Sequence, residues 1–542
     1  MSEKHENVIE CAIIHPSLAH LYNVCENVWE CEFKKHLQYV NFEIQGMLTR
    51  HTINYEWKQK NLSTWTKKKD ELVSKLVVPL YKLSKQGDLY NISCRPGSLH
   101  LLQHCNTKLR ITNRFPYPTQ KPQNYQWTND FPFSLHSYQT EAIDRLPSQK
   151  HAHVEITTGG GKAAIILKIV KNSGLRCAVI VPGKENFKSL TLEFIKYFGS
   201  DMIGLYGDGK KILNRPITIC IGKSLSLIQR EENAAAWTFF QSLDMMLVDE
   251  SHTWGAQTMS KVCYGLLATI PYRLFLSATQ VRSKEEDNLL FSIIGPCVFT
   301  LSTAEAVRKN YISYHQYEIY KDIPAARTQG QEEALIKASH DTPMAIRRIA
   351  FLYNDTIAEI IMDRCLRDLK QRKASLVLVD EVGQIGLLVE KLMTLEAAFD
   401  VNTIAFAHGE TNADRLKALG LPRNTAKSME AAVLSMNRGE KLLMIATGCV
   451  QTGASFFTPQ TCYNFVGGGA KNRVKTLQGA VGRAVRKWTS NPYITQAQEC
   501  VERKETATIV DFDVEQKQLK KHLAKRITYY EMSGTPINRV VI

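Results

Sequence analysis

HAHVEITTGGGKA, at residues 151–163, is the stretch of sequence that decides the fold of this chain. Its first part is rich in β-branched residues, which suit a half-buried strand, and the AAIILKIV that follows the lysine begins an apolar helix. Between them, Gly159, Gly160 and Gly161 permit positive φ angles and a close approach of bare backbone to a ligand. With Lys162 directly after them they predict a phosphate cradle, in which backbone N–H groups and a helix N-terminus face the phosphates. The alternative is an ordinary glycine turn between a strand and a helix.

The composition is that of a large globular protein with an excess of positive charge. The 542 residues are 44% hydrophobic and 22% charged, and a chain of this length predicts about three domains. The net charge of +15 favours a polyanionic partner such as nucleic acid; a generic basic surface is the alternative. The 13 cysteines include no CxxC pair and indicate reduced thiols in a cytoplasmic protein. No signal-peptide pattern and no apolar run of about 18 residues is present, so we expect no membrane partner.

Residues 1–125 differ from the rest of the chain. They are rich in aromatic residues, His and Lys, and they contain no strand–glycine–helix unit. We therefore predict an N-terminal accessory domain there, which binds nucleic acid or a protein partner. Within it, Glu71–Leu83 is predicted to be a helix disturbed by Pro79. The proline-rich segment 116–132 predicts a linker to the next domain.

From about residue 133 onward, short apolar strands alternate with helices, which is typical of parallel α/β sheets. A polar break near 300–345 separates two such series. We therefore predict an α/β protein with two parallel-sheet lobes in tandem, 126–302 and 303–542, and a cleft between them. The predicted strands of the first series are Val154–Thr157, Cys177–Val181, Ile217–Ile221, Met245–Val248 and Arg273–Leu276. Those of the second are Ser375–Val379, Thr403–Phe406, Leu442–Ala446, Cys462–Phe465 and Thr508–Val510.

Two carboxylates follow one of these strands directly. Met245–Val248 is wholly apolar and is followed by Asp249 and Glu250. Ligands of α/β sheets bind at the carboxyl ends of strands, and carboxylate oxygen is the ligand type that Mg²⁺ prefers. Asp249 is thus a candidate Mg²⁺ ligand, and Glu250 a candidate for polarising a water that attacks a phosphate. An acidic strand end without a catalytic role is the alternative.

Several motifs, in this order, resemble those of superfamily 2 helicases and translocases, whose two lobes are RecA-like. The sequence contains FSLHSYQTEAI, TTGGGKA, DESH, LFLSATQ, IATGCVQTGASF and LQGAVGRAVR. The resemblance spans about residues 133–515. IGLYGDGKK, ITICIGKSL, YRLFLSATQVR and LKKHLAKRITYY are most similar to the branch that contains UvsW, XPB and the poxvirus transcript-release helicases.

The resemblance implies ATP and Mg²⁺ as cofactors and a role for each matching residue. The nucleotide-binding residues that it implies are Gln139, Thr158, Gly159, Gly160, Gly161, Lys162, Ala163 and Gly453. The implied catalytic residues are Lys162, Asp249, Glu250, Gln478, Arg483 and Arg486, with Asp249 on the metal. The implied nucleic-acid contacts are Pro182, Gly183, Ser224, Thr447 and Thr452. Arg483 and Arg486 would reach the triphosphate from the second lobe, and Ser277 and Thr279 would connect the ATP side to the strand side.

One position departs from the family pattern. The residue after the glycine-loop lysine is normally Thr or Ser, whose hydroxyl binds Mg²⁺, but here it is Ala163. Alanine has no oxygen to offer. Either water fills that coordination position, or Thr157 or Thr158 substitutes, or hydrolysis is slow.

The resemblance favours an ATP-driven DNA helicase or translocase that acts on single-stranded, forked or branched DNA. An RNA helicase or transcript-release factor would carry the same motifs, because their contacts are to the nucleic-acid backbone. Ala163 leaves open a non-catalytic clamp that ATP closes on nucleic acid. A motor within a replication, repair or transcription assembly is a fourth hypothesis. A phage or a cytoplasmic virus, acting in the host cytoplasm, is compatible with the cysteine usage.

Overall fold

The computed structural model describes residues 8–15, 18–40, 44, 47–48, 62–75, 77–102, 105–114, 131, 133–230, 233–278, 287–341, 343–407, 429–451, 455–467, 482 and 485–541. The chain forms two compact units. The first comprises Met1–Ile156 and Gly161–Thr300, and the second comprises Thr157–Gly160 and Leu301–Ile542. The first half of the glycine loop is therefore packed with the second unit. Among the described residues, no helix combines the length and apolarity needed to span a bilayer.

The first unit begins with a five-stranded sheet of order β5-β6-β2-β1-β7. Strands β2 and β6 alternate buried side chains with more exposed ones, and with β1 they cover an apolar core that includes Trp29 and Phe33. The bounds are β1 Val8–His15, β2 Leu18–Cys25, β5 Tyr81–Gln86, β6 Leu89–Cys94 and β7 Lys108–Asn113, with α1 at Glu26–Val28 and α4 at Leu62–Ser74. The predicted helix over Glu71–Leu83 is wrong beyond Ser74, because the segments VVP and YKLSKQ form the strands β4 (Val77–Pro79) and β5.

A two-stranded ribbon ties this N-terminal part to the parallel sheet that follows. The ribbon consists of β3 (Gln38–Val40) and β4 (Val77–Pro79). Tyr39 and the adjacent Leu80 are buried in the same apolar core as α11 (Asp287–Ile294). Asn288 Nδ2 also donates to the Gln38 carbonyl at 2.9 Å. The N-terminal residues thus complete the core of the first unit.

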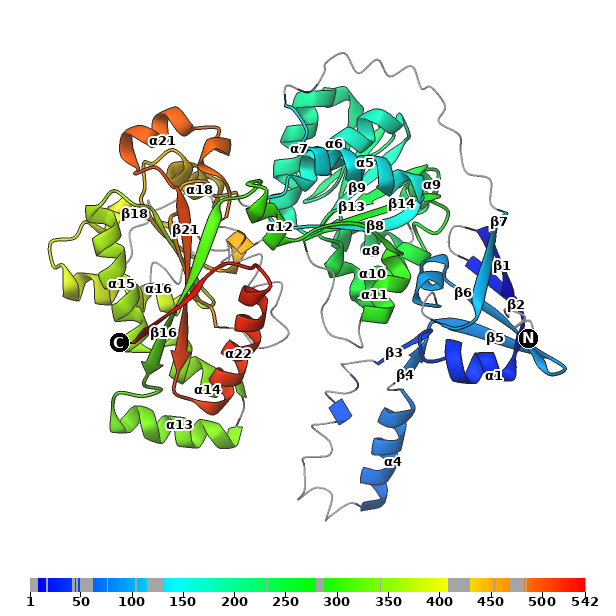
Figure 1. Ribbon diagram of the computed structural model, residues 1–542, viewed down its shortest axis with the longest axis horizontal. Helices are drawn as coiled ribbons and strands as arrows, with labels where there is room; N and C mark the ends of the chain where they lie inside the picture. The colour runs from blue at the N-terminus through cyan, green and yellow to red at the C-terminus, as the bar shows by residue number, and fades with distance from the viewer. Residues whose placement is uncertain are drawn as a thin grey trace, which may run out of the picture. The chain divides into compact units, whose positions relative to one another are not determined.

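The second sheet of the first unit has the order β11-β10-β12-β9-β13-β14-β8-β15. Its central strands are buried along their whole length and pair in parallel, as expected for continuous apolar runs. The strands are β8 His151–Ile156, β9 Cys177–Val181, β10 Ile203–Gly207, β11 Lys210–Ile212, β12 Ile217–Ile221, β13 Met245–Val248, β14 Tyr272–Ser277 and β15 Cys297–Leu301. The helices are α5 Ser137–Ser148, α6 Lys162–Ser173, α7 Lys184–Phe198, α8 Gly222–Arg230, α9 Ala234–Gln241, α10 Gln257–Tyr264 and α11 (Figure 1).

The second unit contains a seven-stranded sheet of order β18-β19-β17-β20-β21-β16-β22, and all its recorded strand pairs are parallel. The strands are β16 Tyr314–Ile323, β17 Ser375–Val379, β18 Ile404–Ala407, β19 Leu443–Ala446, β20 Thr461–Phe465, β21 Thr506–Val514 and β22 Ile537–Val541. The helices are α12 Thr303–Arg308, α13 Gln329–Asp341, α14 Pro343–Arg347, α15 Asp355–Lys370, α16 Gly383–Leu395, α18 Met429–Asn437, α21 Ile494–Cys500 and α22 Lys517–Glu531.

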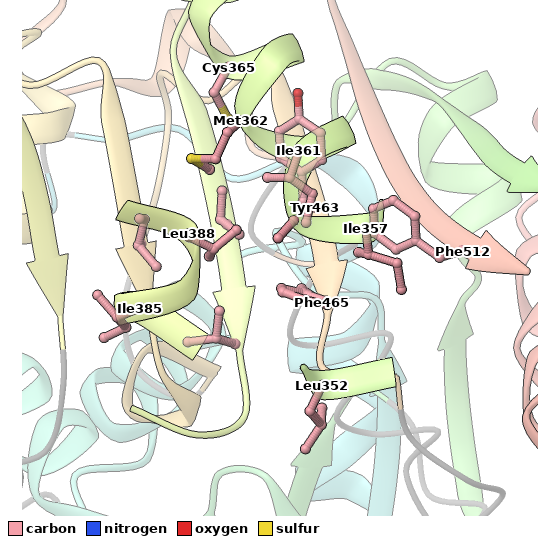
Figure 2. Close-up of a cluster of buried hydrophobic side chains, with 14 of the residues drawn as sticks. Leu352, Ile357, Ile361, Met362, Cys365, Ile385, Leu388, Tyr463, Phe465 and Phe512 are labelled. Carbon is pink, nitrogen blue, oxygen red and sulfur yellow. The ribbon is translucent and has the colours of Figure 1, made fainter. Parts of the chain in front are cut away.

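Helices α15 and α16 cover this sheet with apolar faces. Asn354 begins α15, because its side chain accepts a hydrogen bond from the Ile357 N–H. Figure 2 shows Ile361 and Met362 of α15 and Leu388 of α16 in one buried cluster with the aromatic side chains of β20 and β21. The structure thus confirms the predicted α/β class with two parallel sheets. It corrects the polar break at 300–345, which contains the ten-residue strand β16.

A buried ionic network joins the sheet of the second unit to α22. Asp511 lies on β21 and accepts hydrogen bonds from the Arg526 guanidinium at 2.7 and 3.0 Å. The Tyr530 hydroxyl donates to the same carboxylate at 2.7 Å. The side chains of Arg526 and Asp511 are only 4% and 1% exposed. Each charge therefore depends on the other for its solvation.

The substitution Asp511→Ala should lower the free energy of unfolding of the second unit by about 3–5 kcal/mol, because it leaves the Arg526 guanidinium buried without a counter-charge. Urea unfolding followed by circular dichroism measures the change. Asp363→Ala is the matched control, since it breaks the exposed Asp363–Arg367 pair on α15 and should have little effect. Equal losses in both variants would contradict the prediction.

Candidate nucleotide and nucleic-acid site

The glycine loop connects β8 to α6 and has the backbone geometry that its sequence predicts. Gly159 and Gly161 have φ angles of +87° and +72°, where side chains other than glycine are strained. The Gly160 N–H donates to the Thr157 carbonyl at 3.0 Å, which closes a tight turn. Helix α6 begins at Lys162, so the helix N-terminus follows the turn directly. This arrangement suits phosphate oxygens.

Lys162 and Glu250 form a largely buried ion pair. Lys162 Nζ lies 3.3 Å from Glu250 Oε1, and the two side chains are 11% and 13% exposed. Glu250 has a φ of +51°, an unusual value for a residue with a side chain. This backbone conformation is what directs a carboxylate from the end of β13 toward the glycine-loop lysine.

Glu250 is also connected to the neighbouring strand. The Ser277 hydroxyl, at the end of β14, donates to Glu250 Oε2 at 3.5 Å and lies 2.9 Å from His252 Nδ1. His252 Nδ1 is itself 3.4 Å from Glu250 Oε2. Lys162, Glu250, His252 and Ser277 thus form one polar network, which we call the Glu250 network. The sequence motifs DESH and LFLSATQ meet in it.

The two adjacent carboxylates of β13 have opposite pKa shifts. Burial raises the pKa of Asp249 to about 7, and the neighbouring Glu250 charge adds to the rise. Burial would also raise the pKa of Glu250, but the Lys162 ammonium and the His252 hydrogen bond outweigh it and hold that pKa well below its ordinary value. Glu250 therefore stays ionised at neutral pH, while burial favours the protonated form of Asp249 up to about pH 7.

The residues around Asp249 fit a divalent cation. When Asp249 is ionised, two carboxylates share the single Lys162 ammonium, which leaves a net negative charge on carboxylate oxygens, the ligand type that Mg²⁺ prefers. Ala163 contributes no oxygen to this site. Thr157 was one candidate to replace the hydroxyl ligand that Ala163 lacks, but its hydroxyl is hydrogen-bonded to Thr303 at 2.8 Å. Asp249 would hold the metal, and Thr158 or water remains to complete its ligands.

Gln139, the predicted adenine-reading residue, caps its own helix. Its Oε1 accepts from the His136 N–H at 2.9 Å at the start of α5. Its Nε2 lies 3.5 Å from the Gly161 carbonyl. The structure therefore brings Gln139 next to the glycine loop, and its contact with a base stays a prediction.

The predicted nucleic-acid residues of the first unit lie at one edge of the sheet. Pro182 and Gly183 follow β9, and Ser224 follows β12 at the start of α8. These strands are neighbours, with β10 next in the order. At the end of β10, Asp208 Oδ1 is 2.8 Å from Lys184 Nζ. The sequence analysis did not select these two residues as site residues; Asp208 lies within the quoted segment IGLYGDGKK, whereas Lys184 lies outside it.

Few of the predicted residues of the second lobe are described by the structure. Thr447 is buried directly after β19. The Arg486 guanidinium lies 5.8 Å from the centre of the Phe457 ring, and its carbonyl accepts from the Ser313 hydroxyl at 3.0 Å. Among the predictions that lie outside the described residues are Thr279, Thr452, Gly453, Gln478 and Arg483. The roles of all these residues stay predictions.

Comparisons with known proteins agree with the motifs. Residues 132–282 match the family described as type III restriction enzyme, res subunit (ResIII). The DNA 3′-5′ translocase XPB2 of Sulfurisphaera tokodaii is 25% identical over 213 residues, which are 39% of this chain and 44% of that protein. This chain thus spans less than half of the length of the curated relative that it matches.

Two solved structures share the fold. A fragment of a candidate HsdR subunit of a type I restriction enzyme from Vibrio vulnificus YJ016 has a TM-score of 0.50 at 14% identity, over 76% of this chain and 70% of that chain. The ATP-dependent type ISP restriction-modification enzyme LlaBIII, bound to DNA, has a TM-score of 0.50 at 12% identity, over 76% of this chain and 32% of that chain.

The fold and the candidate site define a protein with tandem RecA-like sheets and a glycine loop whose backbone geometry suits phosphate oxygens. The order of the motifs, the ResIII match over residues 132–282 and the XPB2 relative support the resemblance of this chain to helicase superfamily 2. The predicted resemblance to that superfamily is therefore confirmed.

Neutralising Asp249 and neutralising Glu250 should change the folding stability in opposite directions. An unfolded aspartate loses its proton near pH 4, whereas folded Asp249 keeps its proton up to about pH 7. Folding stability therefore falls as the pH rises between these values. Asp249→Asn should stabilise the nucleotide-free and metal-free protein at pH 8 by about 1–2 kcal/mol, and much less at pH 5.

Glu250→Gln is the matched variant. It removes a charge that Lys162 stabilises, so it should destabilise the protein at pH 8. Thermal denaturation at both pH values measures the two effects. Shifts of the same sign in both variants would show that the carboxylates do not share one counter-charge.

Proposed function

We propose that this protein is a nucleic-acid-dependent ATPase that translocates along DNA and unwinds or remodels single-stranded, forked or branched substrates. The Glu250 network carries the proposal. It places an ionised carboxylate beside the lysine of a phosphate-binding loop and connects both to the end of the next strand. XPB2 supports DNA as the track, since that relative is a DNA translocase.

In this mechanism each residue of the network has one task. The glycine loop and the N-terminus of α6 bind the phosphates, and Lys162 reaches their outer oxygens. Glu250, ionised by its partners, orients the attacking water and accepts its hydrogen bond. Mg²⁺, held by Asp249, would neutralise charge on the phosphate oxygens. Ser277 responds to changes at Glu250 and His252 through its hydroxyl.

The basic rim at the ends of β9, β10 and β12 is the proposed track for the nucleic-acid backbone. Lys184 hydrogen-bonds to Asp208 and lowers its pKa, and the nearby ammonium groups of Lys188 and Lys210 add to that effect. Cations gathered at one sheet edge bind phosphates without reading sequence. Pro182, Gly183 and Ser224 lie along the same edge.

The remaining roles are also proposals. Gln139 would contact the base, Gly453 would lie at the nucleotide, and Thr447 and Thr452 would contact the strand. Gln478, Arg483 and Arg486 would act on the triphosphate. An arginine placed on the developing charge is worth roughly 10³–10⁵ in rate in related phosphoryl transfers. We expect the protein to work in the cytoplasm, within a replication, repair or transcription assembly.

An ATPase titration with single-stranded, forked and duplex DNA and with RNA tests the proposal. Phosphate release should be stimulated most by single-stranded or forked DNA, and stimulation should fall steeply between 50 and 200 mM salt because phosphate contacts release counterions. Lys162→Ala should abolish turnover. Equal or greater stimulation by RNA would identify an RNA helicase instead, and no stimulation by either would reject the motor.

Ala163 favours a second candidate, a clamp that binds ATP and nucleic acid with slow hydrolysis. Ala163→Thr should restore a hydroxyl ligand and lower the Mg²⁺ concentration that half-saturates binding of a fluorescent ATP analogue, by several-fold. Ala163→Val has the same shape without the oxygen and should not. If wild-type protein binds ATP and DNA together without turnover, and Ala163→Thr gains turnover, the clamp is the natural state. Identical behaviour of Thr and Val at this position would remove the metal argument.

A further inference from the structure

The start of the glycine loop is tied to the segment where the chain leaves the first unit. Thr157 directly follows β8, and its N–H donates to the Leu301 carbonyl at 3.1 Å. Its hydroxyl lies 2.8 Å from the hydroxyl of Thr303. Thr157 is 7% exposed, so a hydroxyl that loses this partner is left without a ready replacement from solvent. The backbone N–H and the side-chain hydroxyl of Thr157 are thus both hydrogen-bonded to residues 301–303.

The anchoring residues are themselves fixed. Leu301 ends β15, which is the neighbour of β8 in the sheet. Ser302 caps α12, because its hydroxyl accepts from the Glu305 N–H at 3.1 Å. Thr303 is the first residue of that helix. The Thr303 hydroxyl therefore cannot move far unless the cap of α12 opens.

The other side of Thr157 is the phosphate turn. Its carbonyl accepts the Gly160 N–H that closes the turn at 3.0 Å. Thr157–Gly160 packs with the unit that begins at Leu301, whereas the chain on either side packs with the first unit. A displacement of residues 301–303 must either move this turn or break the two hydrogen bonds of Thr157.

We propose that Thr303 is a positioning residue, which through Thr157 sets the shape of the phosphate-binding turn and couples nucleotide affinity to the conformation of the connector at 301–303. The inference rests on the proposed function, because it takes the turn to be a nucleotide site. The sequence gives no hint of it, since Thr303 lies outside every recognised motif.

Binding of a fluorescent ATP analogue and steady-state ATP hydrolysis on single-stranded DNA test this coupling. Thr303→Val removes the hydroxyl and keeps the shape, and Thr303→Ser keeps the hydroxyl. Thr303→Val should weaken nucleotide binding and raise KM for ATP about tenfold, which is the size of one lost buried hydrogen bond, with kcat within twofold. Thr303→Ser should stay within twofold of wild type in all three quantities.

Thr157→Val and the double variant complete a cycle. If the two hydroxyls act on each other, the double variant should bind nucleotide no more weakly than either single variant. Additive losses would overturn the pairing. Unchanged affinity in Thr303→Val, or equal losses in Thr303→Val and Thr303→Ser, would overturn the positioning role. A lower melting temperature with unchanged affinity and KM would show that the contact only stabilises the fold.

Failure of the underlying site gives a different result. Wild-type protein that binds the analogue no better than Lys162→Ala would reject the nucleotide site itself, and the coupling with it. Wild-type binding that depends on Lys162 but ignores Thr303 would reject the coupling alone.

Discussion

The buried pair of Lys162 and Glu250 is the interaction on which the site depends. Strands β13, β14 and β8 are consecutive in the sheet, and Glu250, Ser277 and the glycine loop follow their carboxyl ends. Two carboxylates and one ammonium at this edge leave a negative charge to be balanced. That imbalance, more than any single contact, makes the site suited to a metal-bound polyphosphate. Burial is the main cause of the raised pKa of Asp249, and the neighbouring Glu250 charge adds to it.

The parallel sheets could be predicted from the sequence because their strands are apolar on both faces. Cys177–Val181, Ile217–Ile221, Met245–Val248 and Ser375–Val379 have the same bounds in the sequence analysis and in the structure. Strand β16 was missed because YHQYEIYKDI alternates polar and apolar residues next to a polar segment. The N-terminal sheet was missed for a related reason, since its strands bury one face and carry Lys, Glu and Asn on the other.

The parts of the candidate site that depend on residue type could be predicted from the sequence. The parts that depend on backbone conformation and on contacts between distant segments could not. The three glycines, Lys162 and the carboxylate pair of Asp249 and Glu250 can be recognised in the sequence as candidate phosphate-binding and metal-binding groups. The left-handed backbone of Glu250 and the contact of Thr157 with Thr303 cannot, because they depend on how distant strands are aligned. Ala163 shows the opposite case. The sequence alone raised the question of which group replaces the missing hydroxyl ligand of Mg²⁺. The structure answers part of it, because the Thr157 hydroxyl is hydrogen-bonded to Thr303.

The ribbon of β3 and β4 has a consequence for how the chain is made. Its Tyr39 and the adjacent Leu80 pack into a core that includes α11, and Gln38 bonds to a residue 250 positions further along the chain. During synthesis from the N-terminus, these apolar side chains leave the ribosome long before α11 has been synthesised. The packing of the β3–β4 ribbon is therefore completed only after α11 has been synthesised.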